Sequence, residues 1–169
     1  MTKRLTAAAL AATVGFLALS TPQAQAGEPY WQCVTFARMF SGIQIFGDAW
    51  TWWNQALERF RTGDSPETGS VLVFRPEGRM SRGHVAVVSD ILTDRVIRVT
   101  HANWGGSRGK VEENVTVVDV SQQGDWSQVK VWYAPINDLG TTIYPTYGFI
   151  YKDRRDGVQM VSAPGVSSQ

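Results

Sequence analysis

Apolar residues recur at helical spacing in two stretches of the N-terminal third of the chain. The first runs from Cys33 to about Phe40 without glycine or proline, and Ser41–Gly42 ends it. The second begins after Asp48, an N-capping residue type, and we expect it to end at Gly63. Its apolar stripe comprises Ala49, Trp53, Ala56, Leu57 and Phe60.

Three tryptophans fall on the second predicted helix. Trp50 and Trp53 are most simply assigned to the core, whereas Trp52 lies off the stripe and is the better candidate for exposure. The chain has seven tryptophans, more than a core of this size needs. We therefore expect some of them to form a surface for a ligand.

From about Gly69 onward, short apolar runs alternate with turn residues, which is the pattern of antiparallel strands. The expected strands are 71–74, 84–89, 96–104, 115–120, 129–133 and 147–151. Two helices followed by a run of strands predict an α+β domain. Short N-terminal helices would pack on an antiparallel sheet of about five to six strands.

The strand expected over 96–104 carries polar groups at the end of an apolar face. Alternate residues of a strand share a face, and this face consists of Ile97, Val99, His101 and Asn103. An unpaired buried polar group costs about 1–3 kcal/mol, so the two polar side chains need partners. His84, at the start of the neighbouring strand, is the partner we expect.

Both ends of the chain differ from this domain in composition. Lys3 and Arg4 precede the apolar run 5–19, and residues 24–26 form an A-x-A cleavage site, which together predict a signal peptide. The run is shorter than the ~20 residues of a membrane-spanning helix, although an uncleaved anchor is the alternative. The expected organisation is a signal peptide over 1–26, one domain over 27–151 and a flexible C-terminal tail over 152–169.

Composition and charge exclude several classes of protein. Hydrophobic residues make up 43% and charged residues 18%, which is typical of a globular domain. The formal net charge is +1, and removing the signal peptide changes it to −1. We therefore expect no nucleic-acid partner and, after cleavage, no stable insertion into a membrane.

Cys33 is the only cysteine, which is unusual for an exported protein. It cannot form an internal disulfide, so the thiol is free, paired between molecules or catalytic. Its place in the first turn of a helix favours a thiolate, because free backbone N–H groups and the helix dipole stabilise negative charge there. Residues 30–32 are not the small apolar residues that precede a lipidated cysteine.

The chain has two histidines, His84 and His101, and both lie at ends of expected strands. A cysteine protease or amidase needs a thiolate, an imidazole base and a third polar group that orients the imidazole. Cys33, His84 and then His101 or Asn103 supply these roles in chain order. The cysteine and two histidines would also make three metal ligands, but no H-E-x-x-H or paired-cysteine spacing is present. We expect no metal and no cofactor.

Four successive segments resemble the motifs of CHAP domains, the cysteine- and histidine-dependent amidohydrolases/peptidases related to NlpC-type cell-wall peptidases. The segments are Trp31–Val34 (WQCV), Pro66–Phe74 (PETGSVLVF), Gly83–Val88 (GHVAVV) and Val99–Trp104 (VTHANW). The resemblance extends from about Trp31 to Tyr133. It implies a papain-like α+β fold and hydrolysis of amide bonds, usually in peptidoglycan. Cys33 matches the family's nucleophile and His84 its general base.

One position departs from the family pattern. CHAP domains commonly have a glutamate two residues before the asparagine that matches Asn103, and here that residue is His101. A carboxylate stabilises an imidazolium better than a neutral imidazole does. However, the NlpC-type relatives place a histidine as the third member. We expect His101 to orient His84, with Asn103 as a fourth polar contact.

Three further residues are candidates for the site. The backbone N–H of Cys33 and the side chain of Gln32 are expected to hold the oxyanion, although Gln32 is alternatively an ordinary surface glutamine. Trp31 and Trp104 flank catalytic positions and are candidates to line the substrate groove. Packing in the core or at its rim is the alternative for both tryptophans.

Together these observations predict an exported cysteine hydrolase that cleaves amide bonds in peptidoglycan through a thioester. The bond is either the N-acetylmuramoyl-L-alanine amide or one in a peptide crosslink. The expected partners are peptidoglycan peptide stems, and we expect a monomer in the bacterial periplasm or outside the cell. One alternative is a catalytically weak peptidoglycan-binding or regulatory module of the same fold. The other is a redox-active or intermolecularly disulfide-linked thiol protein.

Overall fold

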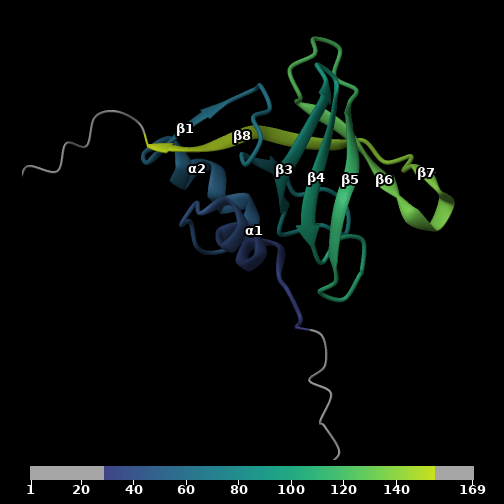
Figure 1. Cartoon of the computed structure of the whole chain (residues 1–169), viewed down its shortest axis with the longest axis horizontal. Helices are drawn as coiled ribbons and strands as arrows, with labels where there is room; N and C mark the ends of the chain where they lie inside the picture. Colours follow the sequence, from purple (N-terminus) through teal and green to yellow (C-terminus); the bar gives the residue numbers. More distant parts are fainter. Residues whose placement is uncertain (1–28, 155–169) are drawn as a thin grey trace, which may run out of the picture.

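The computed structural model describes residues 29–154 (Figure 1), so the predicted signal peptide and the segment 155–169 lie outside the described residues. Two helices and two 3₁₀ turns accompany the strands. The helical elements are α1 (Cys33–Ser41), η1 (Ala49–Thr51), α2 (Trp52–Leu57) and η2 (Ala134–Ile136). The strands are β1 (Phe60–Gly63), β2 (Val71–Phe74), β3 (His84–Thr93), β4 (Val96–Ala102), β5 (Val111–Asp119), β6 (Gln128–Tyr133), β7 (Asp138–Leu139) and β8 (Tyr144–Arg154).

The first predicted helix is confirmed, and the second is wrong in length. α1 ends at Gly42, whose left-handed backbone (φ 76°) directs its N–H to the carbonyl of Arg38. The second stretch starts as the 3₁₀ turn η1 and continues only to Leu57. Residues 60–63 form β1 instead, which pairs with β8.

On the second stretch, the assignments of Trp50 and Trp52 are also wrong, whereas Trp53 packs against the core as expected. Trp52 is fully buried, whereas Trp50 is 44% exposed. A 3₁₀ turn has three residues per turn rather than 3.6, so the buried face runs through Ala49, Trp52 and Ala56. The apolar stripe drawn for a continuous α-helix therefore shares Ala49 and Ala56 with this face but misses Trp52.

The predicted α+β class with N-terminal helices on an antiparallel sheet is confirmed, but the sheet differs from the prediction. It has eight strands in the order β1-β8-β2-β3-β4-β5-β6-β7. The long strand β8 also pairs with β6, through Gln128 with Pro145 and Val129 with Tyr144. Strands β8, β2, β3, β4, β5 and β6 thus close into a six-stranded barrel, with β1 and β7 outside it. Strand β8 continues three residues beyond the predicted boundary at Tyr151.

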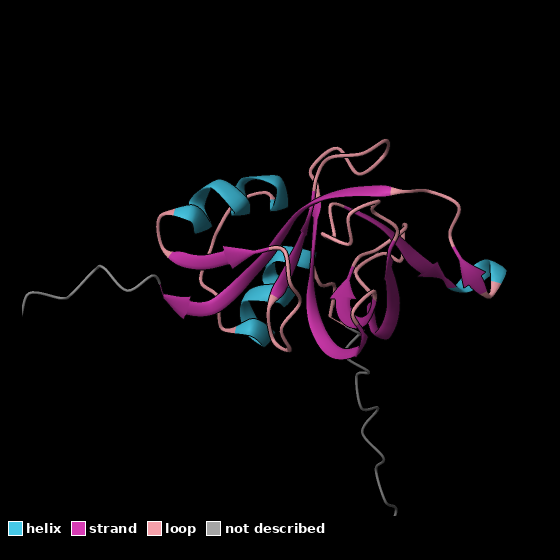
Figure 2. Ribbon diagram, turned by 90° about the horizontal axis from the view of Figure 1, so that it is seen from above, coloured by secondary structure: helices cyan, strands magenta, loops and turns pink. Residues whose placement is uncertain are grey.

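Two apolar clusters hold these layers together. Along β2, Val71 and Val73 belong to the cluster under the helices, while Leu72 and Phe74 belong to the cluster inside the barrel. This strand is buried on both faces, which explains its unbroken apolar run. Figures 1 and 2 show α1 and α2 on one side of the barrel and β7 at the opposite side. Within residues 29–154, no helix is both long and apolar enough to cross a membrane.

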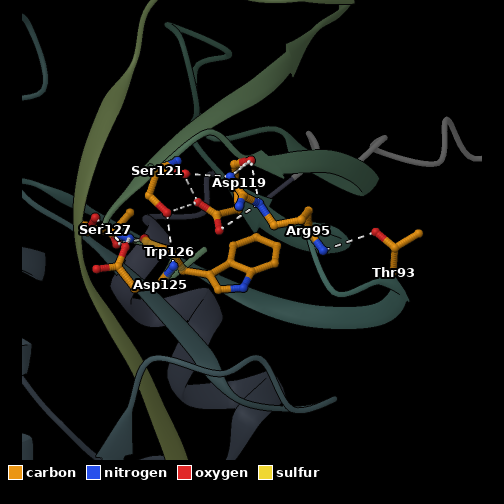
Figure 3. Close-up of polar contacts among 8 residues, drawn as sticks. Thr93, Arg95, Asp119, Ser121, Asp125, Trp126 and Ser127 are labelled. Atoms are coloured by element: carbon orange, nitrogen blue, oxygen red, sulfur yellow. Dashed lines mark hydrogen bonds and ion pairs between the residues drawn. The ribbon is translucent and has the colours of Figure 1, made fainter. Parts of the chain in front are cut away.

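A buried polar network closes the barrel at the start of β4 and the end of β5 (Figure 3). The Asp119 carboxylate accepts hydrogen bonds from the N–H and hydroxyl of Ser121, at 2.8 and 2.6 Å. Arg95 places its Nε 3.2 Å from the other carboxylate oxygen. Because β4 and β5 are antiparallel, this network lies at the opposite end of both strands from His101.

Candidate active site

Cys33 is the first residue of α1, and Gln32 is its N-cap residue, with an extended backbone (φ −88°, ψ 145°). α1 packs on β3 and β4, so the helix brings the thiol to the part of the sheet where His84 begins β3. Backbone hydrogen bonds from Val85, Val34 and Cys33 itself lower the pKa of the thiol, but burial has the larger effect and raises it. The net shift is therefore opposite in direction to the one expected from the helix start.

The two histidines contact each other. Nε2 of His84 lies 3.1 Å from Nδ1 of His101, and both side chains are buried. Burial, and after it the proximity of His101, lowers the pKa of His84 well below its usual range. Burial also lowers the pKa of His101 to about 4. Both imidazoles are therefore neutral near pH 7, and one donates its N–H to the other.

Aromatic rings enclose the histidine pair. Trp104 stacks on His101 with ring centroids 5.3 Å apart and meets His84 edge-on at 4.8 Å. Phe74 approaches His84 edge-on at 5.7 Å, and Tyr144 packs against Trp104. These rings exclude water from the imidazoles, and this burial is the cause of their lowered pKa values.

Asn103 does not contact His84. β4 ends at Ala102, and Asn103 has a left-handed backbone (φ 61°), so the expected sharing of a face by His101 and Asn103 is wrong. The Asn103 side chain instead accepts a hydrogen bond from the N–H of Gly109 at 3.0 Å. The structure thus brings His101, rather than Asn103, to His84.

The amide of Asn103 determines the orientation of Gln32. The N–H of Gly109 can only donate, so it must meet the oxygen of Asn103. The Asn103 NH₂ group then donates to Gln32 Oε1 at 3.1 Å. Because Oε1 is the atom so occupied, the NH₂ group of Gln32 remains a donor beside Cys33.

These residues fall within a single family match. Residues 23–103 match the family model of the CHAP domain. The match places residues 23–103 in the CHAP-domain family. The match contains Cys33, His84 and His101 and ends at Asn103. CHAP domains are typically hydrolases of the amidase or peptidase type with activity toward peptidoglycan. None of the curated proteins compared with the chain matches it.

The protein has a cleft of about 1210 Å³ at this site. Its walls come from the start of α1, the β2–β3 connection, the segment after β4 and the region from β6 to β8. Residues that line it include Gln32, Cys33, Arg79, Arg82, His84, Asn103, Trp104, Tyr133, Thr142 and Tyr144. The arginines and Tyr133 were not foreseen, because the sequence does not show which loops border the cysteine. Among residues 29–154, no group of His, Cys, Asp or Glu side chains gathers as a metal site.

The two tryptophans beside the motifs have different surroundings. Trp104 lines the cleft as well as covering the histidines. Trp31 packs against the apolar cluster under the helices and meets Phe36 edge-on at 6.2 Å. Its backbone N–H donates to the carbonyl of Gly109, which ties the segment before α1 to the loop after β4. Trp31 is therefore a packing residue and is not part of the described cleft wall.

One carboxylate next to the histidine pair was not predicted from the sequence. Glu112 on β5 is the cross-strand neighbour of His101, and its Oε2 lies 3.8 Å from His101 Nε2. The sequence feature that could have indicated this carboxylate is the pair of adjacent glutamates at the start of an apolar run. Only the register between β4 and β5 shows which of them faces the histidine.

Proposed function

We propose that the protein is an exported cysteine hydrolase that cleaves amide bonds in peptidoglycan. The observation that carries the proposal is the placement of Cys33 and His84 on one cleft, with the Nε2 of His84 held by His101. This arrangement leaves Nδ1 of His84 as the nitrogen that serves the thiol. The match to the CHAP-domain family supports the class of reaction.

The mechanism begins with a neutral thiol and a neutral imidazole, because burial disfavours the charged form of each. As Cys33 Sγ attacks the amide carbonyl, its proton passes to Nδ1 of His84. The oxyanion accepts hydrogen bonds from the backbone N–H of Cys33 and from the NH₂ group of Gln32. His84 then protonates the leaving amine, the C–N bond breaks, and the acyl group remains on Cys33 Sγ as a thioester. His84 next takes a proton from the water that hydrolyses this thioester and releases the thiol of Cys33.

Two guanidinium groups and the carboxylates of Asp48 and Glu77 line the cleft, and the guanidinium groups suit a peptide stem that carries free carboxylates. Arg79 and Arg82 line it, and the Arg82 side chain is 81% exposed although one of its nitrogens lies 3.6 Å from Asp48. Exposed guanidinium groups bind carboxylates in a bidentate manner. We propose peptidoglycan stems as the partner, an N-acetylmuramoyl-L-alanine amide or a crosslink as the bond, and a monomer acting in the periplasm or outside the cell.

The test compares the purified protein with its Cys33→Ala variant on isolated peptidoglycan. Mass spectrometry of the soluble fragments identifies the amide that is cleaved. We expect fragments from the wild type and a loss of at least about 10³-fold in the variant, because the thiolate is the nucleophile. Circular dichroism of the variant checks that it folds.

Two outcomes would contradict the proposal. Undiminished fragment release by Cys33→Ala would show that this thiol is not the nucleophile. Equal binding of peptidoglycan by both forms, with no fragments from either, would favour a binding module of the same fold.

A further inference from the structure

Behind His101, away from the cleft, lies a carboxylate that the mechanism above does not use. His101 and Glu112 are paired across β4 and β5, and His101 Nε2 is 3.8 Å from Glu112 Oε2. Both atoms are buried and neither has a hydrogen-bond partner among the described residues. His101 is 1% exposed, so its free nitrogen has no access to solvent. The carboxylate of Glu112 faces this nitrogen at ion-pair distance.

The surroundings of this carboxylate act on its pKa in opposite directions, and the net effect is upward. Burial raises the pKa of Glu112, while the positive charge of Lys110 lowers it. The Glu112 side chain keeps 26% of its surface exposed, which limits the effect of burial. In its ionised form the carboxylate only accepts hydrogen bonds, and the nitrogen of His101 that faces it then carries the proton.

We propose that Glu112 is a positioning residue that fixes the tautomer of both histidines; this inference rests on the proposed cysteine hydrolase. A neutral imidazole has one N–H, so a proton on Nε2 of His101 leaves its Nδ1 as an acceptor. Nε2 of His84 then donates across the 3.1 Å contact. The Nδ1 of His84 is thereby left unprotonated and ready to take the proton of Cys33.

Without the carboxylate the pair can adopt the reverse arrangement. His101 would then carry its proton on Nδ1 and donate to Nε2 of His84. His84 would hold its own proton on Nδ1, where it blocks transfer from Cys33. Glu112 thus supplies, from the next strand, the negative charge that the third position of this chain lacks. It also stabilises the imidazolium that forms on His84 during the reaction.

Glu112→Gln tests the proposal, with Glu113→Gln as the matched control. Glu113 is the next residue on β5 and is exposed, so its substitution removes the same charge without touching His101. In Glu112→Gln we expect kcat for peptidoglycan to fall on the order of 10²-fold with KM nearly unchanged. We expect Glu113→Gln to match the wild type in both constants.

Two readouts do not depend on peptidoglycan cleavage. The ¹⁵N chemical shifts of the imidazoles report which nitrogen carries the proton, and the rate of Cys33 alkylation by iodoacetamide reports thiol activation. We expect the wild type and Glu113→Gln to show the proton of His84 on Nε2. We expect Glu112→Gln to place protons on Nδ1 of both histidines and to slow alkylation about tenfold or more.

The outcomes separate the two proposals. A wild type that leaves peptidoglycan intact would overturn the proposed function, while the imidazole shifts would still decide the role of Glu112. A wild-type His84 with its proton on Nδ1 would overturn the role of Glu112, even if the Gln variant fails to fold. A folded Glu112→Gln variant with unchanged imidazole shifts and an unchanged alkylation rate would also overturn the role of Glu112.

Discussion

At the scale of single residues, the most informative feature of the site is the series of hydrogen bonds that links Gly109 to Asn103 and Asn103 to Gln32. Each step is fixed by the fact that a backbone N–H can only donate. Asn103 thus acts on Gln32 rather than on His84. Its role differs from that of an imidazole-orienting residue, although both need a polar side chain near the thiol.

Gln32→Ala removes the proposed side-chain donor of the oxyanion site. We expect kcat to fall on the order of 10²-fold with little change in KM, because the donor acts on charge that develops only in the transition state. Gln44→Ala is the matched control, since Gln44 contacts backbone carbonyls at the opposite end of α1. Steady-state kinetics on a soluble stem peptide measure both constants. An unchanged kcat in Gln32→Ala would assign the oxyanion to backbone donors alone.

At the scale of elements, Gly83 is where three segments meet immediately before His84. It has φ 67°, and a Cβ there would lie 2.8 Å from the Phe74 carbonyl and 3.1 Å from the backbone nitrogen of Trp50. Gly83 therefore lets the end of β2 and the 3₁₀ turn η1 approach the start of β3. The position of the imidazole base depends on this close packing.

Gly83→Ala is expected to lower the free energy of unfolding by about 2–4 kcal/mol, because it adds steric overlap to a left-handed backbone. It should also lower kcat/KM on the order of tenfold or more through displacement of His84. Gly78→Ala in the same connection is the control, since it also has positive φ (52°) but no atom within 4 Å of an added Cβ. That control should lose only about 1 kcal/mol and keep its activity. Urea unfolding and kinetics compare them, and equal losses would refute the packing argument.

Most strands could be predicted from the sequence because each has a compact apolar run, as in Val71–Phe74. The short strands β1 and β7 carry no such signal, and η1 is hidden inside an apparent helical stripe. Closure of the barrel depends on the pairing of β6 with β8, which is a long-range contact that local patterns do not encode. The same limit applies to Glu112. Cys33 and the two histidines stand out because their residue types are rare in this chain, whereas the role of a glutamate can be inferred only once the register of its strand is known.

At the scale of the whole molecule, the two ends of β4 and β5 have different chemistry. The end near Asp119 is closed by a carboxylate whose oxygens meet Arg95 and Ser121 (Figure 3). The other end buries two neutral histidines among aromatic rings. Burying an uncharged base makes it available as a proton acceptor, but it also makes folding sensitive to acid.

The sign of that sensitivity follows from the histidine pKa values. In the unfolded chain a histidine titrates near pH 6.5, whereas in the folded protein the pKa of His101 is about 4 and the pKa of His84 is well below its usual range. As the pH falls below about 6.5, the unfolded chain binds protons that the folded protein does not, so stability is lost down to about pH 4. At about pH 5 the share of His101 alone is about 2 kcal/mol.

Urea unfolding of the wild type and of His101→Gln, each at neutral pH and at about pH 5, tests this expectation. The variant should lose about 2 kcal/mol less than the wild type across that interval, because its glutamine does not titrate. Groups remote from the histidine pair contribute to both proteins and cancel in the comparison. His84, whose pKa is lowered further by His101, adds to the difference in the same direction. An equal loss in both proteins would mean that His101 takes up its proton without unfolding. Its contact with Glu112 would then stabilise a charged imidazole in the folded state.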